Sequence, residues 1–162
     1  MNGGRLQIAR LAGPEDAEWC AHLMAASEPW RTLGRGFEAS LRAVSDPDRE
    51  TWLARREGRR VGFITLNLKG AFVGYVQSIA VADEARGQGV GSEILRFAEE
   101  RIFREHANVF LCVSSFNEGA RRLYERLGYR VVGVLEAFLV DEHDEILMRK
   151  TRGPILGRTA GH

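Results

Sequence analysis

The chain has almost no excess of charge and no long apolar run. Its 162 residues include 23 Lys and Arg against 22 Asp and Glu, a formal net charge of +1. Without a bulk field of either sign, we expect no binding of nucleic acid through backbone charge. No stretch approaches the roughly 18 apolar residues of a membrane-spanning helix, and segment 1–10 lacks the apolar region of a signal peptide. We therefore expect a cytoplasmic protein that binds neither nucleic acid nor membrane.

Cysteine, histidine and proline are also scarce. The two cysteines, Cys20 and Cys112, lie among apolar residues, which is typical of reduced, buried thiols and not of a disulfide framework. The four histidines have no metal-ligand spacing, so we expect no metal site. Glycine is the abundant residue, with 18 glycines against 4 prolines and no three-residue period. This excludes a collagen-like chain and leaves the purpose of the glycines to be explained.

Hydrophobic periodicity and turn residues predict a single domain over residues 1–152, followed by a flexible tail over 153–162. The predicted element order is β-α-α-β-β-β-α-β-α-β-β. We expect strands at 6–11, 51–55, 61–66, 71–81, 109–113, 130–139 and 145–149. We expect helices at 14–26, 37–44, 92–106 and 117–127. The acidic run 141–144 is predicted to be the turn of the last hairpin.

A glycine-rich loop, Arg86-Gly87-Gln88-Gly89-Val90-Gly91, lies between a predicted strand and a predicted helix. Glycines there let the backbone approach a ligand, and the free amides of a helix N-terminus favour a phosphate. The loop lacks the lysine of a P-loop. It also lacks the third glycine of a dinucleotide fingerprint, because Ser92 stands there. Taken alone, the loop could also be a tight connection without a ligand.

Two motifs in this sequence resemble those of one known protein family. Ile79-Ala80-Val81 followed by the glycine loop resembles motif A of the GNAT superfamily of N-acetyltransferases. About 26 residues after Gly91, the pattern from Asn117 through Ala120 and Tyr124 to Gly128-Tyr129 resembles motif B of the same family. The resemblance covers roughly residues 6–150. It implies an α/β fold with a mixed central sheet of six to seven strands, about four helices, and splayed fourth and fifth strands.

The resemblance implies acetyl-coenzyme A as the cofactor and a direct transfer of its acetyl group to an amine. The loop amides would hold the pyrophosphate, and the backbone of the fourth strand would pair with the pantetheine arm. The residues so assigned to the cofactor are Ile79, Ala80, Val81, Arg86, Gly87, Gln88, Gly89, Val90, Gly91, Ser92, Asn117 and Ala120. Tyr124 matches the tyrosine that protonates the leaving thiolate. From the residues alone, Asn117 could equally be a helix cap and Tyr124 a core aromatic.

The acceptor and the general base are less defined. The resemblance places the acceptor beside the first two helices, their connecting loop and the last hairpin. Glu28 and Trp30 are therefore expected to contact it, although Trp30 could instead cap the core. The acidic turn 141–144 could likewise attract a cationic amine or simply be solvated. Some relatives have a glutamate where Cys112 stands here, which leaves the base to water, Glu28 or Glu136. The acceptor is expected to be a small-molecule amine or a peptide amine, and the protein a monomer or homodimer. The alternative is a non-catalytic module that binds or senses acyl-CoA.

Overall fold

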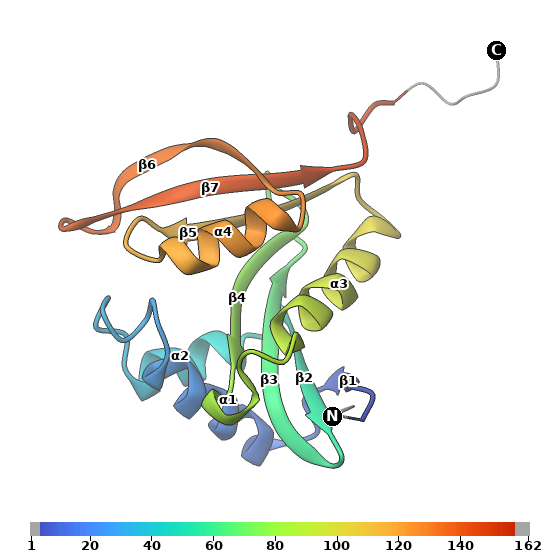
Figure 1. Cartoon of the computed structure of the whole chain (residues 1–162), viewed down its shortest axis with the longest axis vertical. Coiled ribbons are helices and arrows are strands. Elements are labelled where there is room, and N and C mark those ends of the chain that lie inside the picture. The colour runs from blue at the N-terminus through green and yellow to red at the C-terminus, as the bar shows by residue number, and fades with distance from the viewer. Residues whose placement is uncertain (1–3, 158–162) are drawn as a thin grey trace.

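The structure is a computed structural model that describes residues 4–157 (Figure 1). The strands are β1 (Gln7–Arg10), β2 (Glu50–Arg56), β3 (Arg59–Asn67), β4 (Tyr75–Val81), β5 (Asn108–Ser114), β6 (Arg130–Val140) and β7 (His143–Thr151). The helices are α1 (Pro14–Ala26), α2 (Phe37–Val44), α3 (Val90–Phe103) and α4 (Glu118–Arg126), with a short 3-10 helix, η1 (Asp83–Ala85). Within residues 4–157, no helix has the length and the apolar run that a membrane crossing needs.

The seven strands of residues 4–157 form one mixed sheet in the order β1-β2-β3-β4-β5-β7-β6. Neighbouring strands are antiparallel except for the central pair, β4 and β5, which are parallel. Helix α3 packs on one face of the sheet, and α1 and α2 pack on the other (Figure 1). The predicted α/β class, with its seven strands and four helices, is confirmed.

Strands β4 and β5 separate soon after they meet. Only Tyr75 with Phe110 and Val76 with Leu111 are paired. Immediately beyond, the register of β3 with β4 shifts so that Gln77 has no partner on β3. A bulge of this kind bends a strand and increases its twist. From residue 77 onward, one edge of β4 therefore has no neighbouring strand among the described residues.

Gly74 fixes the point at which the two strands meet. Its φ is +94°, and a Cβ at this position would collide with the carbonyl oxygen of Asn108. Its own carbonyl accepts from the Phe110 amide at 2.9 Å. Only glycine combines this conformation with so close an approach. The prediction of a strand from residue 71 was wrong for this reason, since the chain bends through 71–74 and β4 begins at Tyr75.

The other sequence-based boundaries differ from the structure by a few residues at most. Helix α2 has the predicted bounds, and α3 begins at Val90, directly after Gly89, instead of at Ser92. The predicted tail falls partly on residues 158–162, which lie outside the described residues, as do residues 1–3 at the start of the chain. Pro154 to Gly157 are exposed.

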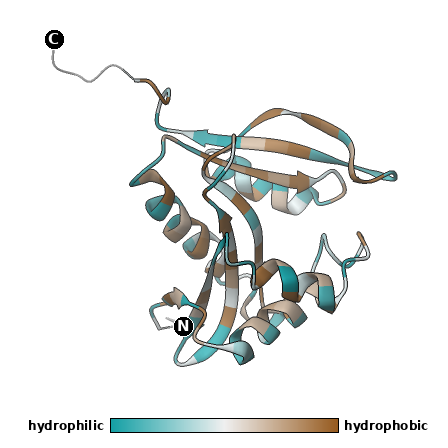
Figure 2. Ribbon diagram, turned by 180° about the vertical axis from the view of Figure 1, so that it is seen from behind, coloured by the Kyte–Doolittle hydropathy of each residue, from teal (hydrophilic) through white to brown (hydrophobic). Residues whose placement is uncertain are grey.

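Edge strand β6 is apolar for much of its length (Figure 2). Val132, Val134 and Phe138 nevertheless remain more than half exposed, at 55%, 56% and 57%. Within the described residues, no strand pairs with the outer edge of β6. Exposed apolar side chains along an unpaired edge favour association with another surface.

A buried ion-pair cluster ties α1 to the hairpin of β2 and β3. Asp16 is 3% exposed and accepts hydrogen bonds from Arg55 at 2.7 Å, Arg60 at 2.9 Å and the Ala12 amide at 2.9 Å. Burial alone would raise the pKa of Asp16, but the Ala12 amide and the two guanidinium groups outweigh it and lower the pKa. The carboxylate therefore stabilises the fold at pH values above its unfolded pKa and loses this effect as the pH falls through the folded value.

We expect Asp16→Asn to destabilise the fold by roughly 2 kcal/mol at pH 7, less than for a fully buried pair because both arginines are partly exposed. The difference from wild type should narrow below about pH 4, where the carboxylate of the unfolded chain is protonated. Urea denaturation at pH 7 and at pH 3.5 measures both effects. Asp48→Asn, which removes an exposed pair with Lys69, is the control and should change nothing measurable. Equal midpoints for the two variants would contradict the assignment.

Candidate functional site

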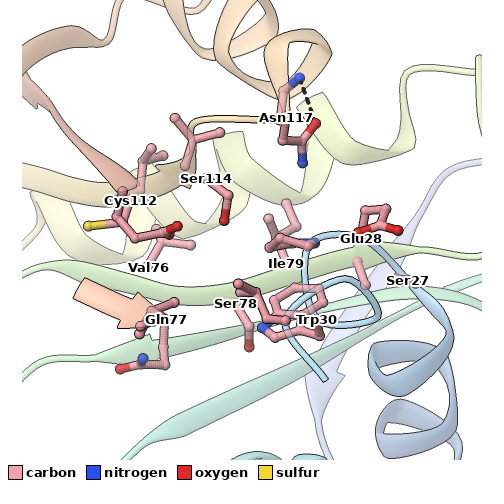
Figure 3. A pocket seen from close by; sticks show the side chains of 18 of the residues that line it. Ser27, Glu28, Trp30, Val76, Gln77, Ser78, Ile79, Cys112, Ser114 and Asn117 are labelled. Atoms are coloured by element: carbon pink, nitrogen blue, oxygen red, sulfur yellow. Dashed lines mark hydrogen bonds between the residues drawn. The ribbon is translucent and has the colours of Figure 1, made fainter. Parts of the chain in front are cut away.

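A cleft of about 340 Å³ opens where β4 and β5 diverge (Figure 3). Its walls come from β4, the carboxyl end of β5, α4, the loop after α1, and the last hairpin. Of the predicted site residues, the cleft brings together Glu28, Trp30, Ile79, Ala80, Val81, Arg86, Asn117, Ala120 and Tyr124. The remaining predicted residues, Gly87 to Ser92, follow Arg86 in the chain and do not line the cleft itself.

The backbone of the glycine loop is exposed at Gly87 and Gly89, and its side chains hold the loop in place. Gly87 and Gly89 have φ values of +73° and +77°, the left-handed conformation that other residues rarely adopt. Gln88 is held by the Glu84 carbonyl at 3.1 Å and by Arg56 at 2.9 Å. The Val90 side chain is buried in the core. These contacts fix the shape of the loop without using its amides.

The loop amides themselves are unused. The six successive amides of Gly87 to Ser92 donate to no acceptor within residues 4–157, and the last three open helix α3. Unpaired amides in a turn followed by a helix N-terminus create a region of positive potential. The Arg86 guanidinium adjoins this region, and it contacts the Val81 carbonyl at 3.4 Å and the Asp83 carboxylate at 3.3 Å. The arrangement suits a phosphate or pyrophosphate group.

Strand β4 supplies a second set of free backbone groups. Gly62, Phe63 and Ile64 of β3 pair with Val81, Ala80 and Ile79 along one edge. The opposite edge of β4 faces the cleft, and beyond Val76 no strand of residues 4–157 lies beside it. An extended polar chain can add to such an edge as an extra strand would.

Helix α4 contributes one face to the cleft through Asn117, Ala120 and Tyr124. Asn117 caps the helix, because its Oδ1 atom accepts from the Ala120 amide at 3.3 Å, and it also lines the cleft (Figure 3). Tyr124 is half-buried, and its ring lies edge-on to that of Tyr129, with 5.9 Å between the ring centroids. Burial raises the pKa of Tyr124 to about 12. Its hydroxyl therefore stays protonated and can donate a proton or hydrogen bond near neutral pH.

Glu28 and Trp30 form the wall opposite β5 and α4 (Figure 3). Trp30 is 9% exposed and packs in the core between the sheet and helices α1 and α2, so it both caps the core and lines the cleft. Glu28 accepts from Arg31 at 3.0 Å and from the Thr32 amide at 3.3 Å. Hydrogen bonds from Thr32 and Arg31 lower the pKa of Glu28, which makes it a weak proton acceptor. The other suggested base, Glu136, is exposed on β6 and does not line the cleft.

The residues that sequence reasoning missed lie on the β5 side of the cleft. Glu145 is paired with Ser114, is 3% exposed and lines the cleft. The turn predicted at 141–144 is shorter than expected, because β7 already begins at His143. A signal was present, since Glu145 is an acid at the start of an apolar strand. Cys112 also lines the cleft and is half-buried, unlike the fully buried Cys20. Burial raises the pKa of the Cys112 thiol, which disfavours a nucleophilic role.

Comparisons with known proteins agree with this architecture. Residues 12–129 match the model of the acetyltransferase (GNAT) family. An uncharacterized N-acetyltransferase of Methanocaldococcus jannaschii is 35% identical over 111 residues, which are 65% of this chain and 70% of that protein. The aminoalkylphosphonate N-acetyltransferase of Salmonella typhimurium is 34% identical over 101 residues, covering 59% of this chain and 64% of that protein.

A solved structure shows the same fold at lower identity. An aminoglycoside 6′-N-acetyltransferase, crystallised in complex with coenzyme A, superposes with a TM-score of 0.74 at 20% identity. The match covers 91% of this chain and 98% of that one. Since the family match spans most of the residues that build the sheet, the glycine loop and α4, this chain belongs to the acetyltransferase (GNAT) family.

Proposed function

We propose that this chain binds acetyl-CoA along β4 and transfers the acetyl group directly to the nitrogen of a small-molecule amine. The observation that carries the proposal is the run of six unpaired amides, Gly87 to Ser92, at the end of a strand whose cleft-facing edge is free. Family membership supports acetyl transfer as the activity. The neighbour of the same fold that was crystallised with coenzyme A supports the ligand.

The glycine loop is the proposed pyrophosphate site. The amides of Gly87, Gln88, Gly89, Val90, Gly91 and Ser92 would donate to the phosphate oxygens, and the Arg86 guanidinium would add a positive charge. Hydrogen bonds from amides to a charged phosphate are stronger than those between neutral groups. Because the side chains of Gln88 and Val90 already hold the loop in place, little conformational entropy is lost on binding.

The pantetheine arm is proposed to lie against the free edge of β4. Its amide groups would pair with the backbone of Ile79, Ala80 and Val81, as an added strand does. Asn117 and Ala120 would enclose it from α4, where the small Ala120 side chain leaves room. The cleft lies between these two walls.

Tyr124 is the proposed general acid. Bound acetyl-CoA supplies a thioester, in which the acetyl group is already activated for transfer to nitrogen. Tyr124 lines the same cleft and its hydroxyl remains protonated, so it is proposed to donate its proton to the departing sulfur. Proton donation by a positioned side chain contributes typically about 100-fold to 10,000-fold in rate.

The acceptor is proposed to enter beside Trp30 and Glu28, on the side of the cleft away from α4. The small-molecule amine named in the Salmonella relative supports a small acceptor. We further propose a cytoplasmic location, which the two free cysteines support. The exposed apolar side chains of β6 support a homodimer over a monomer.

Gly89→Val should weaken the binding of coenzyme A at least tenfold, which is about 1.4 kcal/mol. The reason is conformational: a Cβ at Gly89 would meet no protein atom, but φ is +77°, so the substitution strains the turn and moves its amides. Isothermal titration calorimetry measures the affinity. Gly70→Val is the matched control, because Gly70 also has a positive φ, +98°, with open space around it and lies outside the cleft. Unchanged affinity in Gly89→Val would refute the pyrophosphate site.

Tyr124→Phe should lower the rate of amine acetylation by about 100-fold or more while changing the affinity for coenzyme A less than twofold. Release of free thiol from acetyl-CoA across a panel of amines measures the rate. Tyr129→Phe is the matched control. The Tyr129 ring lies next to Tyr124, and its buried hydroxyl has no hydrogen-bond partner within residues 4–157, so its loss should leave the rate unchanged. If the wild-type protein binds coenzyme A but accelerates thiol release with no amine, the non-catalytic binding module is the better description.

A further inference from the structure

One face of the central strands gathers four polar side chains beside the proposed acetyl-transfer site. Tyr75 on β4 is paired with Phe110 on β5, so it shares a face with Cys112 and Ser114, which follow at every second residue. Glu145 on β7 is directly opposite Ser114 and joins the same face. All four line the cleft. Figure 3 shows Cys112 and Ser114 on the cleft wall across from Trp30 and Glu28.

Glu145 differs from the other buried carboxylates of residues 4–157. Asp16 is paired with Arg55 and Arg60, and Glu99 is paired with Lys150 at 2.9 Å. Glu145 is equally buried but has no cation beside it, and its Oε2 atom has no hydrogen-bond partner within the described residues. Burying an unpaired carboxylate is costly, so such a group indicates a partner that comes from outside the chain. For a carboxylate that lines a ligand cleft, the matching partner is a cation.

The other carboxylates near the acceptor side are less suited to this role. Glu28 is engaged by Arg31 and Thr32. Asp141 and Glu142 are exposed at the hairpin tip, and Asp144 accepts from the Ala137 amide at 3.0 Å. Cys112 offers only a neutral thiol. Among the described carboxylates of the cleft, Glu145 is thus the one whose acceptor atom is unoccupied.

We propose, on the basis of the proposed function, that Glu145 binds the ammonium group of the acceptor amine and accepts its proton. An N–H bond of the ammonium breaks, the proton moves to Oε2 of Glu145, and the nitrogen keeps the electron pair as a neutral, nucleophilic amine. The proton then leaves to solvent. The substrate class is a primary amine that carries a positive charge at neutral pH. The exposed apolar side chains of Phe138 and Leu139, which line the same cleft, suit an apolar substituent next to that nitrogen.

The surroundings of Glu145 are consistent with proton acceptance. Burial raises the pKa of Glu145. Ser114 and His143 lower it, but their effect is smaller than that of burial. Tyr75 and Cys112 face it from β4 and β5, and burial raises the pKa of each, so both are neutral near pH 7. The other charged residues that line the cleft are Glu28, already paired, and the cations Arg35 and Arg86. A carboxylate with a raised pKa is a stronger base than an exposed one.

A binding experiment tests this without turnover. The probe is n-butylammonium, titrated by calorimetry into the protein saturated with coenzyme A, which has no acetyl group to transfer. At pH 7.5, Glu145→Gln should weaken binding at least tenfold. Glu136→Gln, an exposed acid on β6, is the matched control and should bind as wild type does. The affinity of the wild-type protein for n-butylammonium should also fall as the pH drops below the raised pKa of Glu145. This measurement does not depend on whether a variant folds. Equal affinity in Glu145→Gln, or pH-independent wild-type binding, would overturn the proposal.

The pH dependence of kcat/KM for an alkylamine supplies the second readout. The kcat/KM of the wild-type protein should change little between pH 7 and the pKa of the amine, because Glu145 deprotonates the bound ammonium. Glu145→Gln can use only the free neutral amine, so its kcat/KM should fall about tenfold for each pH unit below that pKa and approach the wild-type value above it. Parallel profiles for the two proteins would reject Glu145 as the base. A wild-type protein that acetylates no amine would instead reject the proposed function, and the binding experiment would still decide whether Glu145 holds an ammonium.

Discussion

Strands β4 and β5 pair through two residues and then diverge, and each part of the candidate site depends on that divergence. Gly74 brings the strands together where only a glycine fits, and the bulge at Gln77 turns β4 away immediately afterwards. A sheet whose central strands stayed paired would have no free edge on β4 and no cleft. The backbone N–H and C=O groups that the two strands leave unpaired in the centre of the sheet remain available to bind a ligand.

Some of the unpaired polar groups of the structure lie at the cleft. Six buried side-chain atoms within residues 4–157 have no hydrogen-bond partner, and three of them, on Ser78, Ser114 and Glu145, belong to residues that line it. The amides of Gly87 to Ser92 are likewise unused. An unpaired buried polar group destabilises the fold, and at the cleft a ligand can supply the missing partner. The positions of these unpaired groups define three parts of the proposed site: an anion site at the glycine loop, an extended edge along β4, and the Glu145 carboxylate on the acceptor side.

Sequence patterns were sufficient for local features and insufficient for those that depend on pairing between distant segments. Helix α2 and the glycine loop were predictable because spacing and glycine act over a few neighbouring residues. The bend at 71–74 was not predictable, because the need for glycine at position 74 comes from the Asn108 carbonyl 34 positions away. Glu145 was missed because its burial results from the strand order, in which the last strand, β7, lies between β5 and β6.

The most direct test of the account is the response of the loop amides to coenzyme A, followed by amide chemical shifts in a nitrogen-15-labelled protein. The account predicts that the largest downfield proton shifts on saturation belong to Gly87 through Ser92, because these amides would donate to the phosphate oxygens. It also predicts slower hydrogen exchange for Ile79 to Val81, where the pantetheine arm would pair with β4. Binding that leaves the amides of Gly87 to Ser92 unshifted would contradict the central claim that the unpaired backbone beside the diverging strands is the cofactor site.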